Sequence, residues 1–185
     1  MKTLPAGIAL MLVLQVSAQE SWPPLDNSPM DMVYYPLDYP ILKIRKQAPE
    51  APVIKIVYSR PVKKNRKIFG ELVEYGKVWR LGANEATEID CYKDIKIGNI
   101  KIKKGKYTMY AIPEADKWTI IINKDNDVWG SFAYDQQKDI LRTTVKTQKT
   151  DAPVEMFSML FKKTTSGANL LMAWEDTEVA LPISF

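Results

Sequence analysis

Two short stretches of the chain concentrate side chains that can recognise a polar ligand. Residues 59–61 read Ser-Arg-Pro, and residues 79–85 read Trp-Arg-Leu-Gly-Ala-Asn-Glu. Arginine offers a planar fork of donors, asparagine and glutamate supply further donors and acceptors, and tryptophan supplies a face for stacking. With residues of a later segment they form the candidate ligand-binding set: Arg60, Trp79, Arg80, Asn84, Glu85, Trp129, Tyr134, Asp139 and Arg142.

This set has two interpretations, and the sequence leaves both open. The side chains could line a pocket for a polar small molecule or a glycan, since such pockets combine an apolar wall with a few convergent polar groups. Alternatively, the arginines and carboxylates pair with one another in a buried network that holds a loop over the core.

A pair of carboxylates is the one catalytic arrangement that the composition allows. Glu85, Glu88, Asp90 and Asp139 could supply an acid and a base for glycan hydrolysis if two of them lie about 5–9 Å apart across a groove. The plainer interpretation is that Glu88 and Asp90 form the polar face of a strand. The sequence therefore assigns no catalytic residue.

Most other chemistries are excluded by composition. The chain has no histidine and one cysteine, Cys91, so it lacks the usual general base, the histidine-activated nucleophiles and the nitrogen ligands of zinc or iron. Asp125, Asn126 and Asp127 do not begin a calcium loop, because Trp129 and Gln136 stand where such a loop needs oxygen ligands. We expect no metal site and no cofactor.

The N-terminus is typical of an export signal. Lys2 precedes an apolar stretch over residues 4–16 that is short for a membrane span, and small residues at Ser17 and Ala18 suit a signal peptidase. We expect cleavage after Ala18, no membrane span in the remaining chain, and a location in the periplasm or outside the cell.

The net charge of +4 hides a local cluster of basic residues. Between Lys43 and Lys67 there are nine lysines and arginines and one acid, Glu50. A run of this kind can bind nucleic acid, but no aromatic residues alternate with the charges as stacking platforms, so we expect a solvated face or loop and no nucleic-acid partner. The oligomeric state is not predicted.

The elements that position these residues are mostly strands. Residues 19–52 contain seven prolines and form an extended, proline-rich arm, whose apolar side chains we expect to pack on the domain. From residue 53 the pattern has a period of two, and turn residues recur every 8–12 positions. Short strands are predicted at 53–58, 87–92, 95–97, 100–102, 107–112, 118–123, 140–147, 154–162, 169–174 and 179–183.

This pattern predicts an all-β fold for residues 53–185, a single jelly-roll-like sandwich with one short helix at 68–75 that ends before Gly76. Glycine as the first residue of the Gly98-Asn99 connection favours a type II′ hairpin turn.

Several motifs resemble those of a known family. They are residues 58–61 (Tyr-Ser-Arg-Pro), 76–80 (Gly-Lys-Val-Trp-Arg), 82–87 (Gly-Ala-Asn-Glu-Ala-Thr), 104–107, 118–123 and 139–142. In order and spacing they are similar to an exported bacterial family catalogued as domain of unknown function number 2911. Asn65 departs from the glycine usual there, although asparagine also tolerates a positive φ.

The resemblance implies a signal-bearing, sandwich-like protein of Gram-negative bacteria and carries no activity to transfer. The hypothesis that follows is an exported, non-catalytic protein that binds a polar small molecule or glycan. The alternatives are a carboxylate-dependent glycan hydrolase and a purely structural envelope-associated protein.

Overall fold

The computed structural model describes residues 21–185, so the predicted signal peptide at 1–18 lies outside the described residues. The described part has one α-helix, one 3-10 helix and nine strands. The helices are α1 (Tyr39–Ile44) and η1 (Gln136–Lys138). The strands are β1 (Met30–Tyr35), β2 (Ile54–Ser59), β3 (Thr87–Cys91), β4 (Ile95–Ile97), β5 (Ile100–Ile102), β6 (Gly105–Pro113), β7 (Lys117–Asn123), β8 (Asp139–Lys163) and β9 (Gly167–Ser184).

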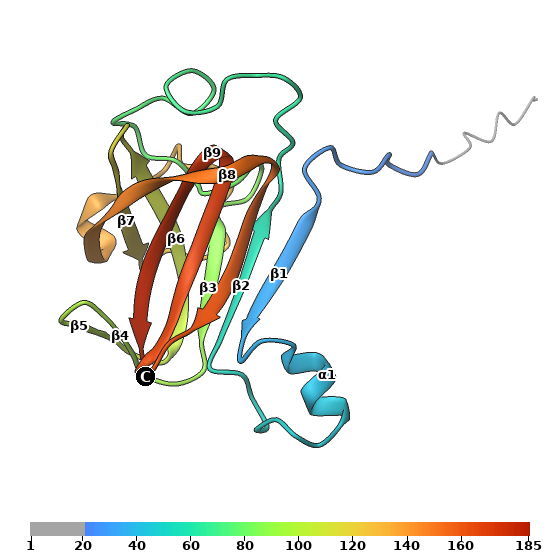
Figure 1. Cartoon of the computed structure of the whole chain (residues 1–185), viewed down its shortest axis with the longest axis vertical. Helices are drawn as coiled ribbons and strands as arrows, with labels where there is room; N and C mark the ends of the chain where they lie inside the picture. Colours follow the sequence, from blue (N-terminus) through green and yellow to red (C-terminus); the bar gives the residue numbers. More distant parts are fainter. Residues whose placement is uncertain (1–20) are drawn as a thin grey trace, which may run out of the picture.

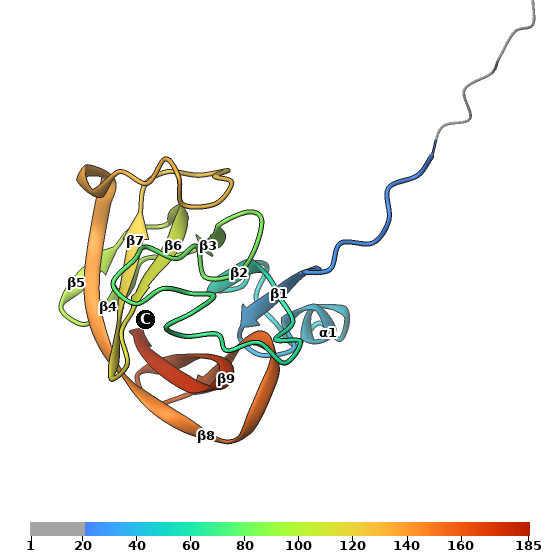
Figure 2. The ribbon, with the colours of Figure 1, turned by 90° about the horizontal axis from the view of Figure 1, so that it is seen from above.

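All nine strands belong to one antiparallel sheet in the order β1-β2-β3-β6-β7-β8-β9-β4-β5, which confirms the all-β prediction. Instead of forming two separate sheets, this sheet curls so that β8 and β9 face β1 to β3 across the core (Figures 1 and 2). The apolar side chains inside the curl form one large cluster. Tyr58 of β2 and Phe157 of β8 pack edge to face within it, with ring centroids 5.8 Å apart.

The curl depends on two long strands. β8 has 25 residues and β9 has 18, where the sequence predicted four shorter strands. The register of β8 against β9 shifts between Lys149 and Val154, around Pro153, and this irregularity bends the strand without ending it. The first part of β8 therefore pairs with β7, while Met156 of the second part pairs with Val62, which follows β2.

The short helix is not where the sequence placed it. Residues 68–75 form turns and not a helix: Gly70 has a φ of 89° and its amide donates to the Val73 carbonyl at 2.9 Å, a tight turn from which Ile68, Phe69 and Val73 all face the core. Instead, α1 lies in the arm and has Pro40 in its first turn, where the missing N–H of proline would have no partner in any case.

The arm also supplies the edge strand of the sheet. β1 pairs with β2 over its whole length, from Met30 opposite Ser59 to Tyr35 opposite Ile54. Arg60 fixes the start of this pairing: its guanidinium forms an ion pair with Asp31 at 2.9 Å and donates to the Phe157 carbonyl and to Ser158 Oγ of β8. The arm segment 30–44 is therefore an integral part of the fold.

Candidate functional site

The loop between β7 and β8 presents two large aromatic side chains to solvent. Trp129 is 61% exposed and Phe132 is 83% exposed, and their rings stack at 5.8 Å with an angle of 18° between the planes. Gly130 lies between them with a φ of 74°, a left-handed conformation that glycine adopts without strain. Two exposed, parallel rings are unusual on a soluble surface and mark a candidate interaction site.

Backbone pairing fixes this loop to the segment that precedes β3. The Gly130 amide donates to the Asn84 carbonyl, and the Ala86 amide donates to the Val128 carbonyl, both at 2.9 Å. These bonds flank the bridge between Glu85 and Trp129, which makes them directly opposed residues of an antiparallel pair. Opposed side chains lie on the same face about 5 Å apart at Cβ, so Glu85 stands beside the Trp129 ring.

A depression of about 230 Å³ adjoins Glu85. Its polar lining consists of Glu85, Glu88 and Asp127, and its apolar lining is Met30, Val57, Ala86 and Val128. Lys106 forms ion pairs with Glu88 at 2.9 Å and with Asp127 at 2.8 Å, and these contacts raise the pKa of the lysine. Glu85 is exposed and has no ion pair within residues 21–185, so it can accept hydrogen bonds from a ligand.

Tyr134, Asp139 and Arg142 of the candidate set also lie together, but they bind one another. Asp139 accepts from the Tyr134 hydroxyl at 2.6 Å, from Asn123 Nδ2 at 2.8 Å and from Arg142 at 3.1 Å. Its side chain is only 7% exposed. The Tyr134 ring packs against Tyr110 on the outer face of the sheet, so this network holds the loop of Trp129 in place.

Burial is the first cause that raises the pKa of Tyr134, and the hydrogen bond to Asp139 is the second. Both disfavour a tyrosinate, since that anion would lose water and would face a carboxylate. Tyr134 therefore acts as a donor and not as a base near neutral pH.

Trp79 does not stack on a ligand, because it is a core residue with 7% exposure. Its indole packs against Phe69, Trp118, Phe157 and Trp174, and its Nε1 donates to the Gly82 carbonyl at 3.1 Å. The cluster of aromatic residues closes the interior at the end covered by residues 60–82.

Arg80 does not form the ion pair that one interpretation of the sequence required. Among the described residues no carboxylate pairs with it, and its Nε is buried without a hydrogen-bond partner. Burial of the guanidinium lowers the pKa of Arg80. Arg80 and Glu85 therefore do not form the buried pair that the sequence allowed.

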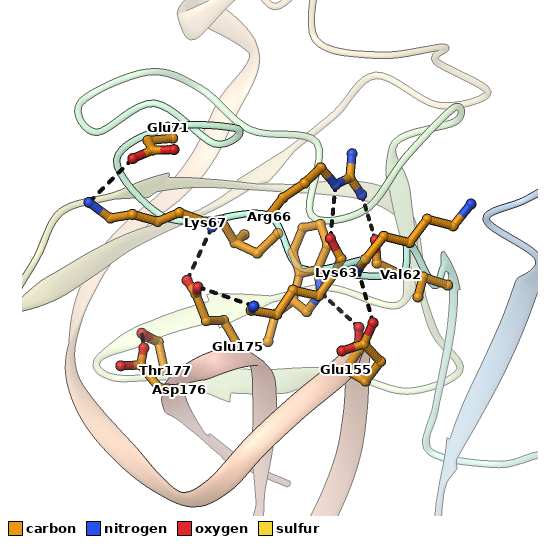
Figure 3. Close-up of polar contacts among 12 residues, drawn as sticks. Val62, Lys63, Arg66, Lys67, Glu71, Glu155, Glu175, Asp176 and Thr177 are labelled. Carbon is orange, nitrogen blue, oxygen red and sulfur yellow. Dashed lines mark hydrogen bonds and ion pairs between the residues drawn. The ribbon is translucent and has the colours of Figure 1, made fainter.

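The basic segment at the end of the predicted cluster is occupied with contacts inside the fold (Figure 3). Lys63 approaches Glu175 at 4.0 Å, Lys67 pairs with Glu71 at 3.6 Å, and Arg66 donates to the carbonyls of Val62 and Lys63. Glu175 also accepts from the Ile68 amide and thereby ties this segment to β9. Lys64, Arg66 and Lys67 remain exposed.

The carboxylates named as catalytic candidates are largely engaged. Asp90 pairs with Lys55 at 2.7 Å, Glu88 with Lys106, and Asp139 with its three donors. No group of three or more metal-ligating side chains within residues 21–185 has the geometry of a metal site. No helix in that range is long and apolar enough to cross a membrane.

Phe132 was missed in the sequence. The one sequence feature that could have indicated it is its position after Gly130, where hydrophobic and polar residues do not alternate. Without such a pattern, an aromatic side chain is not expected to face the core. The candidate site therefore consists of Trp129, Phe132 and Glu85, with the acidic depression beside them.

Comparison with known proteins identifies a family and adds no activity. Residues 41–183 match the family described as Protein of unknown function (DUF2911), and the chain belongs to that family. Neither the curated proteins nor the solved structures contain a significant match.

Proposed function

We propose that this protein is an exported, non-catalytic binding protein whose ligand is a glycan or a similar polyhydroxylated small molecule. The main support for the proposal is the stacked, exposed pair of Trp129 and Phe132, on a loop that backbone hydrogen bonds hold to the segment before β3. A sugar ring has an apolar C–H face that can cover such rings and hydroxyl groups that point outward from its edge.

The polar surroundings suit the same ligand class. Glu85 lies beside Trp129 with both carboxylate oxygens available as acceptors for a pair of hydroxyl groups. Glu88 and Asp127 line the adjacent depression and are already oriented by Lys106. Because Glu88 and Asp127 are already ion-paired with Lys106, less conformational entropy would be lost on binding than with unpaired side chains.

Binding to a panel of soluble polysaccharides and oligosaccharides, measured by affinity electrophoresis and calorimetry, tests the proposal. Trp129→Ala and Phe132→Ala should each weaken binding at least about tenfold, as expected for aromatic anchors. Trp22→Ala is the matched control, because Trp22 is also exposed, at 89%, and lies outside the site. If no glycan binds, or if Trp129→Ala binds like the wild type, the proposal is wrong.

A hydrolase is the second candidate, because Glu85 and Glu88 line one depression. Glu85→Gln separates the two functions. A binding protein should retain most of its affinity, since glutamine still offers an acceptor and a donor, whereas a hydrolase should stop releasing reducing ends. Hydrolysis by the wild type that disappears in Glu85→Gln would replace the binding proposal.

Export is part of the proposal and has its own measurement. Protein recovered from a Gram-negative periplasm or from the medium should begin at Gln19, because residues 16–18 provide the cleavage site after the apolar stretch. Mass spectrometry that finds Met1 in the recovered protein would contradict it.

A further inference from the structure

A second pocket, of about 370 Å³, lies at the end of the curled sheet that residues 60–82 cover (Figures 1 and 3). Its lining comes from three parts of the chain: residues 67–75, the middle of β8 at 147–149, and the middle of β9 at 175–177. The mouth of a curled or closed sheet is a common place for a small ligand. The pocket shares no lining residue with the depression beside Glu85, so it is separate from the proposed glycan site.

The charged side chains that line this pocket are of both signs. Lys67 and Lys149 are the cations, and Glu175 and Asp176 are the anions. A simple anion bound here would face two carboxylates, and a simple cation would face two ammonium groups, and like charges brought together in this way oppose binding. A ligand that carries one charge of each sign avoids both conflicts.

The ion pairs already present leave these groups able to bind a ligand. Lys149 pairs with Asp176, and Lys67 pairs with Glu71 at 3.6 Å; these four side chains are between 48% and 78% exposed. Exposed pairs of this kind contribute little to stability. An ammonium group has three donors and a carboxylate has about four acceptor positions, so each group can contact a ligand and keep its partner.

The strand irregularity in β9 coincides with the pocket. The buried positions of β9 are even-numbered up to Trp174 and odd-numbered from Val179, so the alternation is interrupted over residues 175–178. Glu175 has a φ of 58° at this point, and the register with β8 shifts there as well. Irregularities of this kind change the direction of a side chain and are frequent next to functional sites.

The Glu175 carboxylate is held in a fixed position. One oxygen accepts from the Ile68 amide at 3.1 Å, and the other lies 4.0 Å from Lys63 Nζ (Figure 3). The side chain is 18% exposed. A carboxylate that is positioned before a ligand arrives loses little conformational entropy on binding.

Two aromatic residues supply an apolar part of the lining. Phe69 is a core residue with 4% exposure, and Tyr75 is 45% exposed. The pocket therefore combines an apolar surface with charges of both signs. An amino acid or a dipeptide has the same combination, since its ammonium and carboxylate groups lie close to its side chains.

We propose that this pocket binds a zwitterionic ligand, a free amino acid or dipeptide with an apolar side chain. Glu175 and Asp176 bind its ammonium group, and Lys67 and Lys149 bind its carboxylate. Its side chain contacts the aromatic lining.

Calorimetric titration of the chain beginning at Gln19 with the common amino acids and a panel of dipeptides tests the proposal. At least one probe should bind with a Kd below about 1 mM. The N-acetyl and the amide derivatives of that probe each lack one charge, and each should bind at least about tenfold more weakly. Trp129→Ala should bind the probe like the wild type, so this result does not depend on whether a glycan binds.

Substitutions assign each charge to its partner. The double variant Lys67→Met with Lys149→Met should lose the preference for the free acid over the amide and keep the preference for the free amine over the N-acetyl form. Both lysines are exposed, at 63% and 78%, so this variant should fold. Glu175→Gln should have the opposite effect and reduce the preference for the free amine, while the amide oxygen still accepts from Ile68.

Lys146→Met and Asp151→Asn are the matched controls, because both side chains are exposed on β8 and neither lines the pocket. Both should bind the probe like the wild type. The proposal is overturned if no probe binds below about 1 mM, or if the singly charged derivatives bind as tightly as the zwitterion. A double lysine variant that keeps both preferences overturns it as well.

Discussion

Three predicted ligand-binding residues, Tyr134, Asp139 and Arg142, contact one another, and their contribution to stability can be measured. Tyr134→Phe removes the hydroxyl that donates to Asp139 at 2.6 Å, and Asp139→Ala removes the acceptor. A hydrogen bond to a charged group contributes about 1.5–3 kcal/mol to stability. The carboxylate is 7% exposed, whereas Arg142, which contacts both groups, is 33% exposed and contributes less than about 1 kcal/mol.

We therefore expect a coupling energy of about 2 kcal/mol between Tyr134 and Asp139. Denaturant melts of the wild type, the two single variants and the double variant at pH 7 give this value as a double-mutant cycle. A coupling below about 0.5 kcal/mol would refute the reasoning, because the short bond would then contribute no more than one exposed to water.

The same cycle has a signature at alkaline pH. The pKa of Tyr134 is raised above the ordinary 10.0, so its contribution to stability is complete below pH 10 and is lost as the pH rises through the folded-state value. Asp139→Ala removes one cause of the raised pKa. The stability advantage of the wild type over Asp139→Ala should therefore shrink above pH 10, and a constant advantage would contradict the assignment.

Three further expectations follow from individual side chains. Arg80→Met should leave the unfolding free energy unchanged or raise it by about 1 kcal/mol, since the buried Nε has no partner to lose; a loss above about 2 kcal/mol in denaturant melts would disprove this. Glu85→Ala should cost less than about 1 kcal/mol in the same melts, because the carboxylate is exposed and unpaired. Burial raises the pKa of the Cys91 thiol to about 12 from 9.0, so the wild type should lose about 1.4 kcal/mol per pH unit between pH 9 and 12 relative to Cys91→Ala, and equal slopes for the two proteins would contradict it.

Local patterns predicted the strands well because their causes are local. The period of two and the turn residues place β2 to β7 within about two residues of their observed bounds, and Gly98 has the positive φ that its hairpin turn requires. The continuity of β8 through Pro153 was not predictable in this way. A proline ends a central strand but is tolerated at a bulge, and only the partner strand decides which situation applies.

The candidate site was predictable in composition and not in arrangement. Trp79 and Trp129 are the same residue type in similar loops, yet one is 7% exposed and the other 61%. What separates them is the opposite partner: Trp79 pairs with Ala111 of a buried strand, whereas Trp129 pairs with Glu85 at the surface. That distinction is a matter of topology, which the spacing of residues along the chain does not contain.

The segment from Trp79 to Thr87 contains both buried residues that support the fold and the exposed Glu85 of the candidate site. Leu81 has a φ of 54° although it is not glycine, a conformation that costs on the order of 1–3 kcal/mol. The fold compensates for this cost, because the Leu81 side chain is fully buried and its carbonyl accepts from Thr87 Oγ1 at 2.6 Å. Gly82 has a φ of 154°, and a Cβ there would lie 3.0 Å from the Ser59 carbonyl oxygen, so a larger residue would strain the backbone.

These strained and buried residues force the chain outward at Asn84, whose own φ is 57°. The residue that follows, Glu85, is thereby presented at the surface opposite Trp129. Backbone strain that is held by a core is characteristic of sites that must present a side chain in a fixed position. Trp79, Leu81 and Thr87 support the fold, and their arrangement presents Glu85 at the surface, where the proposed ligand would bind. The two roles therefore belong to different residues of one motif.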